Sequence, residues 1–319
     1  MSEHTVITDS NEETSPGKYK LTVRNKKLTQ LHRWLVIGFN LLSLGGVMVG
    51  LLQLVQGQVT WLDRLLFLAM YLVTGLGGTV GFHRYFTHKS FETTLPIRVG
   101  LAVAGSMAAE GPLIYWVATH RRHHQYSDRI GDPHSPNLVG DRGWKRLYGL
   151  WQGHIGWLLS EDPTNPLLFA KDWVRDPIIA RVNRLYFLWI FLGLALPTLI
   201  AGAATQRWQG AFHGFIWGGL IRMFVVLHYS YGINSICHLW GRRPYQTREQ
   251  STNNAWLGLP TLLGEAWHNN HHAFPDSARF GLKHWQIDLG YGVIRTLEIV
   301  GLAWNVKSPS QLRLQAKQL

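Results

Sequence analysis

Four long apolar stretches constrain the fold of this chain more than any other feature of its sequence. They cover about residues 34–55, 61–82, 186–205 and 209–231. Each has the length of roughly 20 residues that a helix needs to cross a bilayer. Only Gln56 to Thr60 separate the first two stretches, and only Gln206 to Trp208 separate the last two. The sequence therefore predicts an all-α membrane protein whose four transmembrane helices form two hairpins.

The basic residues predict how these hairpins are oriented. Six of them precede the first span: Lys18, Lys20, Arg24, Lys26, Lys27 and Arg33. The two short connections contain one basic residue, Arg207, and Lys and Arg concentrate on the cytoplasmic side of membrane proteins. We therefore expect a multi-pass integral membrane protein with both termini and the active site in the cytoplasm. Residues 83–185 and 232–319 would form a helical cytoplasmic cap.

The net charge of +12 suggests anionic partners. The basic residues flank the apolar spans and do not form a stripe interleaved with exposed aromatic residues, so we expect no nucleic-acid partner. Anionic membrane lipids are the expected partners instead. The single cysteine, Cys237, excludes an intramolecular disulfide bond and a CxxC zinc site, and it indicates a reducing compartment.

The remaining segments are assigned by composition. Residues 1–16 are polar and lack the apolar core of a signal peptide, so we expect a disordered tail, followed by a single membrane domain over 17–319. The apolar segment 95–118 contains Arg98, Glu110 and Pro112. These residues predict that it lies along the membrane surface or covers the site without crossing. Arg222 lies inside the fourth span, where a charge usually marks a pairing or a pathway.

Outside the spans, eight histidines form three tight clusters. They are His83 and His88, then His120, His123 and His124, then His268, His271 and His272. The second and third clusters share the spacing HxxHH. Residues i, i+3 and i+4 of a helix lie on one side, so each HxxHH is expected to aim three imidazoles at one point. This arrangement predicts a metal site.

The number of ligands favours two metal ions. Eight imidazoles exceed the three or four ligands of one zinc ion, and no HExxH motif occurs. Asn234 and His238, four residues apart just beyond the last span, add two further ligands on one helical face. His83 and His88 are about 140° apart on a regular helix, which predicts a helix end between them. Imidazole ligands alone allow iron, copper, zinc or nickel.

The motifs HRYFTH (83–88), HRRHH (120–124), NSICH (234–238) and HNNHH (268–272) resemble those of the membrane fatty acyl desaturases. Among these the chain is most similar to the Δ9, stearoyl-CoA desaturase type, in a bacterial or cyanobacterial form without a fused cytochrome b5. The resemblance implies two Fe2+ ions held by His83, His88, His120, His123, His124, His238, His268, His271 and His272, with Asn234 acting through water. It also implies that O2 and two electrons produce a cis double bond in a saturated fatty acyl chain. A separate ferredoxin or cytochrome b5-like protein would supply the electrons.

The resemblance also suggests residues that surround the metals. Tyr71, twelve residues before His83, would form the floor of a substrate tunnel, and Trp116 and Trp267 would form its walls, with ordinary aromatic packing as the alternative. Arg121 and Arg122 would contact the acyl headgroup or an acidic electron donor, with a structural ion pair as the alternative. Four further residues would orient the ligand imidazoles: Asp132, His134, His154 and Glu265.

One departure from the family pattern leaves the acyl carrier open. Ser160, Glu161 and Asp162 follow the segment 153–159, where the acyl-CoA desaturases of animals carry basic residues. This weakens the case for CoA and favours a lipid-linked acyl chain as an alternative. The rival function is a membrane di-iron hydroxylase or ketolase that acts on an alkane, a sterol or a carotenoid. A metal transporter would place its ligands inside the spans, which this sequence does not do.

Overall fold

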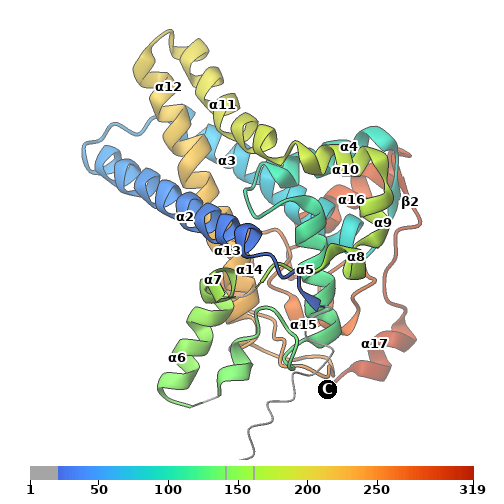
Figure 1. Ribbon diagram of the computed structural model, residues 1–319. Helices are drawn as coiled ribbons and strands as arrows, with labels where there is room; N and C mark the ends of the chain where they lie inside the picture. Colours follow the sequence, from blue (N-terminus) through green and yellow to red (C-terminus); the bar gives the residue numbers. More distant parts are fainter. Residues whose placement is uncertain (1–20, 141, 161) are drawn as a thin grey trace, which may run out of the picture.

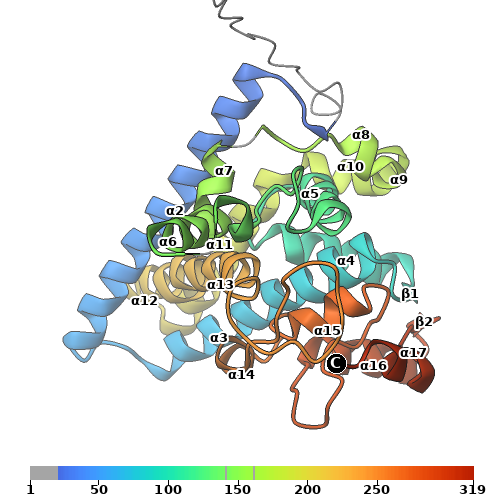
Figure 2. The ribbon, with the colours of Figure 1, turned by 90° about the horizontal axis from the view of Figure 1, so that it is seen from below.

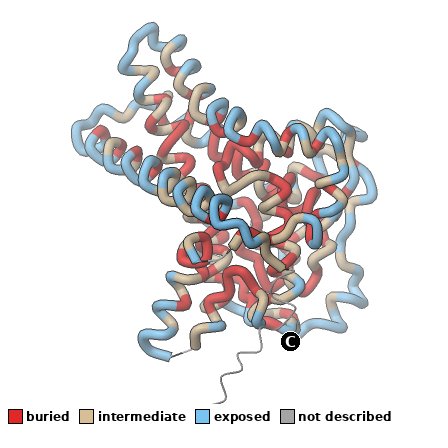
Figure 3. Tube along the Cα trace, in the orientation of Figure 1, coloured by how far each residue is buried: buried red, intermediate tan, exposed pale blue. Residues whose placement is uncertain are grey.

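The computed structural model describes residues 21–140, 142–160 and 162–319. The tail predicted for residues 1–16 lies outside the described residues. Within them the protein is helical, with one two-stranded sheet. Figure 1 shows long helices at the upper left and a cap of short helices below and to the right of them. Buried residues gather where the two parts meet, and exposed residues lie along the outer turns of both, as Figure 3 shows.

The described residues contain four helices long and apolar enough to cross a membrane, as the sequence predicts. They cover Lys26–Val55 (α2), Trp61–Thr87 (α3 and η1), Tyr186–Thr205 (α11) and Trp208–Ile236 (α12, η4 and α13). The parts of the compound helices are α3 (Trp61–Leu76), η1 (Gly77–Thr87), α12 (Trp208–Gly214), η4 (Phe215–Ile221) and α13 (Arg222–Ile236). Three spans are longer than predicted, because their polar ends remain helical beyond the apolar stretch.

Side-chain caps define where the first hairpin begins and turns. The Asn25 side chain accepts a hydrogen bond from the Leu28 backbone at the start of α2. The Thr60 hydroxyl accepts from the Asp63 backbone, and the Asp63 carboxylate accepts from the Thr60 backbone, which forms a capping box at the start of α3. Both caps satisfy backbone N–H groups that a helix start leaves without partners.

Arg222 has no acidic partner among the residues that the structure describes; its fully buried guanidinium binds three backbone carbonyls. It donates to the oxygens of Gly218, Met107 and Gly193 at 2.8–3.3 Å. Pro197 lies inside α11 four residues after Gly193 and has no N–H, so the Gly193 carbonyl lacks its helical partner. Arg222 thus satisfies carbonyls that α11 and the end of α4 leave free.

The cap is built from short helices and two short strands. They are α4 (Leu95–Ser106), α5 (Leu113–Tyr126), η2 (Pro136–Val139), α6 (Trp144–Trp151), η3 (Gln152–Gly156), α7 (Trp157–Ser160), α8 (Pro166–Phe169), α9 (Lys171–Arg175), α10 (Pro177–Arg184), α14 (Ala255–Thr261), α15 (His268–Ala273), α16 (Leu289–Ile299), α17 (Gln311–Lys317), β1 (Glu92–Thr93) and β2 (Ala303–Trp304). The strands pair antiparallel, with Glu92 opposite Trp304. This pairing ties the C-terminal segment to the segment that follows η1.

The apolar segment 95–118 does not form a spanning helix, as predicted. It divides into α4 and the first part of α5, and the loop between them contains Glu110. α4 packs directly on η1: a Cβ atom on Gly77 would lie 2.2 Å from the Gly105 backbone nitrogen. This close contact brings the end of the second spanning helix and the Glu110 loop together.

Candidate metal centre

The structure brings the nine predicted ligand histidines together in two clusters. The five-histidine cluster consists of His83, His88, His120, His124 and His271, and the four-histidine cluster consists of His123, His238, His268 and His272. Within each cluster one ring nitrogen of every residue lies within 4.8 Å of all the others. The histidines come from α5, α15, η1 and the residue after it, and the segment just beyond α13. Segments almost 190 residues apart, such as His83 and His271, thus meet at one place.

The expectation that each HxxHH aims at one point is wrong. On α5, His120 and His124 belong to the five-histidine cluster, whereas His123 belongs to the four-histidine cluster. On α15 the division is reversed: His268 and His272 serve the four-histidine cluster, and His271 serves the other. Residues i+3 and i+4 differ by about 100° around a helix. Each motif therefore supplies both clusters.

The winding of η1 aligns His83 with His88. The His88 backbone N–H donates to the His83 carbonyl at 3.2 Å, a bond from residue i+5 to residue i. Such π-helical bonds bring residues five apart onto one side, which a regular helix does not do. The helix ends at Thr87, so the predicted end between the two histidines is confirmed.

The distances between ring nitrogens fit metal ligands better than hydrogen bonds. The Nε2 atom of His271 lies 2.9 Å from those of both His83 and His124, and His124 lies 3.0 Å from His120. In the other cluster, His238 and His268 are 3.0 Å apart at Nε2. Metal–nitrogen bonds of about 2.1 Å would place neighbouring ligand atoms roughly 3–3.4 Å apart. A chain of imidazoles with at most one proton per Nε2 cannot satisfy all these contacts as donors and acceptors.

Carboxylates fix the orientation of four ligand rings. Glu265 lies 2.5 Å from Nδ1 of His83. Three carboxylates serve the four-histidine cluster: Asp132 at His123 (3.0 Å), Asp128 at His238 (3.1 Å) and Glu249 at His272 (3.5 Å). A proton donated from Nδ1 leaves the Nε2 lone pair free for a metal. This observation supports metal binding independently of the spacing of the histidines.

The electrostatics favour neutral imidazoles at most of the clustered histidines, but not at His238, where burial alone would lower the pKa and the Asp128 carboxylate raises it. Burial lowers the pKa of His120, His124, His268, His271 and His272 well below the usual value, and the neighbouring imidazoles lower it further. Neutral imidazole is the form that binds a metal. Burial alone would raise the pKa of the Glu265 carboxyl, but His83 and Arg84 hold it below its usual value.

The residues predicted to orient the ligands divide into three groups. Asp132 and Glu265 contact ligand rings directly, as described above. His134 stacks on His123 with ring centroids 4.2 Å apart, and its backbone N–H donates to Asp132. His154 instead contacts Ser235 at 3.2 Å and His228 at 3.0 Å, so its hydrogen bonds run to neither cluster.

Two adjoining pockets lie beside the clusters. The outer pocket is lined by residues of α2, α5 and α7, among them His32, Phe39 and Trp157. The inner pocket lies deeper and is lined by His83, His120 and His268. Both are lined by Glu110, Trp116, His120, Ser230 and Asn234. Ligand imidazoles of both clusters thus form part of the inner pocket wall.

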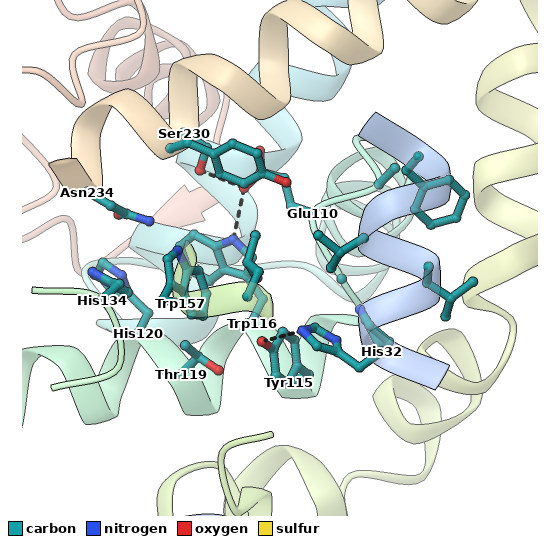
Figure 4. A pocket seen from close by; sticks show the side chains of 18 of the residues that line it. His32, Glu110, Tyr115, Trp116, Thr119, His120, His134, Trp157, Ser230 and Asn234 are labelled. Atoms are coloured by element: carbon teal, nitrogen blue, oxygen red, sulfur yellow. Dashed lines mark hydrogen bonds between the residues drawn. The ribbon is translucent and has the colours of Figure 1, made fainter. Parts of the chain in front are cut away.

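Glu110 is a site residue that the sequence analysis did not assign. Figure 4 shows its carboxylate between Trp116 and Ser230, and both side chains donate to it at 2.9 Å. Burial raises the pKa of Glu110 to about 7, although these hydrogen bonds lower it. An acidic residue inside the apolar segment 95–118 was the sequence signal that could have identified it.

Several predicted substrate contacts lie elsewhere. Trp116 lines both pockets, whereas Trp267 is fully buried, donates to the Ile287 carbonyl and lines neither. Tyr71 also lines neither; its hydroxyl donates to the Thr261 carbonyl at 3.0 Å. Its ring packs with a group of side chains that includes four from the inner pocket wall: Val226, Tyr229, Ile233 and Leu263. Tyr71 thus lies one layer behind the inner pocket.

The two arginines predicted to meet a headgroup are engaged in internal contacts. Arg121 pairs with Asp172 at 2.8 Å and donates to the carbonyls of Phe86, Thr87 and Phe169. Arg122 is buried and donates to the Gly131 carbonyl at 2.7 Å. These contacts support the structural alternative for both residues.

The chain belongs to the fatty acid desaturase family, whose sequence profile matches residues 59–297. It is therefore a membrane oxidoreductase of lipid metabolism. It is 43% identical to a hex-5-enoyl-[acyl-carrier protein] acetylenase of Moorena producens over 300 residues, 93% of each chain. It is 37% identical to an sn-1 stearoyl-lipid 9-desaturase of Anabaena variabilis (84% of this chain, 93% of that protein) and 35% identical to an acyl-CoA C20 Delta5-desaturase of Anemone leveillei (91% and 88%).

Proposed function

We propose that this protein is an O2-dependent acyl desaturase that uses two iron ions, one in each histidine cluster, and inserts a cis double bond, with Δ9 as its position, into a saturated acyl chain. One observation carries the proposal: ligand imidazoles of both clusters, His83, His120 and His268, form part of the wall of one pocket. A chain in that pocket would hold its methylene groups beside the metals. The reaction converts –CH2–CH2–, O2, two electrons and two protons into –CH=CH– and two molecules of water.

The protein's contribution is to position the chain and to hold the metals. The iron ions, when bound, supply the activation of O2. The neutral imidazoles bind them through Nε2, and the carboxylates fix the rings. Trp116, held by Glu110, lines both pockets, and we propose that its ring restricts which carbons reach the imidazoles. Such positioning is the main source of regiochemical control when no protein side chain reacts with the chain covalently.

The floor of the inner pocket favours a defined chain length. Tyr71 supports the wall from behind, and its hydroxyl is held by the Thr261 carbonyl. We propose that Tyr71 sets the depth to which the methyl end of the chain can enter. The 9-desaturase of Anabaena variabilis supports the Δ9 position.

A second candidate activity is acetylenase chemistry, in which a chain that already has a double bond is desaturated again. The 43% identity to the acetylenase of Moorena producens favours it. The same pocket and metals would serve both reactions, because each removes two hydrogens from neighbouring carbons.

The electrons would come from a separate ferredoxin or cytochrome b5-like protein, and the metal centre would face the cytoplasm.

Expression in a host that makes no unsaturated fatty acids tests these proposals. We expect monounsaturated chains in the extracted lipids, with the double bond at carbon 9, and none with a His268→Ala variant. Feeding a monounsaturated acid in parallel tests for a triple bond. Hydroxylated chains without alkenes or alkynes would assign the rival hydroxylase activity and overturn the proposal. Purified protein loaded with iron, with acyl-lipid, acyl-CoA and acyl carrier protein supplied separately, then identifies the carrier.

A further inference from the structure

Helix α6 exposes its apolar face instead of burying it. Four of its five large apolar residues are exposed: Trp144 (75%), Leu147 (56%), Tyr148 (43%) and Trp151 (45%). Their spacing of i, i+3, i+4 and i+7 places them within about 100° of one another around the helix. A surface helix in water normally turns such a face toward the core.

The opposite face holds α6 firmly on the cap. Gly149 is buried against η2, where a Cβ atom would lie 2.2 Å from the Pro136 carbonyl oxygen. Arg146 donates to the Leu239 carbonyl at 3.1 Å, and its guanidinium lies over the Trp240 ring, 5.0 Å from the centroid. These contacts fix the rotation of α6 about its own axis, so its apolar face points away from the cap.

The position of α6 relative to the spanning helices indicates what covers this face. Arg146 of α6 donates to the carbonyl of Leu239. Leu239 lies three residues beyond Ile236, the last residue of the fourth span. Figure 1 shows α6 at the lower left, below α7, and α6 packs against α13, the last part of the fourth span, beside which it lies in Figure 2. α6 is therefore held at the cap end of the fourth span.

The composition of the exposed surface matches the boundary of a bilayer. Tryptophan and tyrosine concentrate at that boundary, where an apolar ring can enter the acyl region while its polar group meets the headgroups. The exposed cations Arg142 and Lys145 flank the apolar face, and anionic lipid headgroups attract such cations. A soluble acidic protein would pair with the cations but would leave the tryptophans without an apolar partner.

We propose that α6 is an interfacial helix whose exposed face, Trp144, Leu147, Tyr148 and Trp151, is inserted in the lipid leaflet on the side of the metal centre. The inference does not depend on the iron or on the reaction. It has a consequence for the site, because α6 continues through η3 into α7, and Trp157 and Leu158 of α7 line the outer pocket. Contact with lipid would hold that wall of the pocket in place.

The chain is well suited to a labelling test because its one cysteine, Cys237, is fully buried, and burial raises the pKa of its thiol. The full-length protein is placed in nanodiscs of phosphatidylcholine and phosphatidylglycerol, with an environment-sensitive fluorophore on Leu147→Cys or on Trp151→Cys. The matched control is Ile130→Cys, whose side chain is 93% exposed in the loop after α5. The protein without an added cysteine should take up no label.

The expected result is a clear difference between the two surfaces. Labels at 147 and 151 should be quenched by lipids that carry a nitroxide near the top of the acyl chain, and iodide should quench them at least about fivefold less than the label at 130. The label at 130 should be quenched by iodide and not by the nitroxide lipids. Quenching by iodide at 147 equal to that at 130 would overturn the proposal. Protection from iodide without quenching by the nitroxide lipid would also overturn it, because it would indicate contact with a protein.

Discussion

The two histidine clusters differ in how their ligands are supported. In the five-histidine cluster, one ring, that of His83, is oriented by a carboxylate, Glu265. In the four-histidine cluster, three rings are oriented by Asp132, Asp128 and Glu249. A carboxylate partner fixes the ring and increases the basicity of the ligand. The four-histidine cluster is thus the more strongly supported of the two, and the five-histidine cluster supplies two of the three ligand rings in the inner pocket wall.

The largest effects should come from the neighbouring ligands His271 and His272, which belong to different clusters. We expect either His271→Ala or His272→Ala to lower the iron content from two ions to one per chain and to reduce product by more than about 10^3-fold, because a single ion cannot complete the reaction. Metal analysis and product analysis measure both. The exposed His284→Ala is the matched control and should keep two ions; one ion in that variant would contradict the assignment.

Substitution of the carboxylates should show that the two clusters differ in how their rings are held. Within the described part of the chain, Glu265→Gln removes the one carboxylate that orients a ring of the five-histidine cluster, whereas Asp132→Asn leaves two at the other cluster. We expect both to weaken iron binding by roughly 10–100-fold, with Glu265→Gln at the upper end. The rate of iron release to a chelator measures this. Faster release from Asp132→Asn than from Glu265→Gln would reverse the comparison.

The ionisation of Glu110, which lines both pockets, should make the free energy of unfolding depend on pH. Its pKa is raised from 4.5 to about 7 by burial, so its contribution to stability is fully present below pH 4.5 and is lost as the pH rises toward 7. The loss amounts to about 3 kcal/mol at pH 8. Thermal unfolding of the metal-free protein at pH 5 and pH 8 measures it, and Glu110→Gln should remove this dependence. An equal decrease in both proteins would show that other groups cause it.

A smaller effect is expected behind the inner pocket, at Tyr71. Tyr71→Ala should open space below the wall and shift the preferred acyl chain toward longer chains by roughly tenfold in relative rate, the scale set by one or two methylene groups in an apolar pocket. Competition between saturated chains of different lengths measures the shift. Iron content should not change, and an unchanged chain preference would exclude Tyr71 as the floor.

The smallest effect should occur at His154. Because its hydrogen bonds run to His228 and Ser235 and to neither cluster, His154→Gln should keep two iron ions and change activity by less than about twofold, as a substitution away from the reacting groups does. Loss of one ion would show that His154 supports a cluster after all.

The sequence predicts the four spans, the nine clustered imidazoles and the helix end before His88, because length, composition and spacing carry that information directly. It does not predict how the imidazoles divide. The HxxHH spacing shows that three rings lie on one side of a helix. Positions i+3 and i+4 differ by about 100° around the helix, and this difference assigns their rings to separate clusters only when two such helices face each other. Glu110 and Glu249 also escaped prediction, because neither lies within or directly beside one of the histidine motifs.

Arg222 has a consequence for how the protein assembles. Its guanidinium is satisfied by carbonyls of Gly193 and Gly218 in the second hairpin and of Met107 in the cap. A hairpin inserted alone would leave one of these bonds unmade in a medium where an unsatisfied cation is costly. The second hairpin therefore reaches its final packing only after the end of α4 docks. The final packing of the second hairpin is thus coupled to the docking of the cap through Arg222.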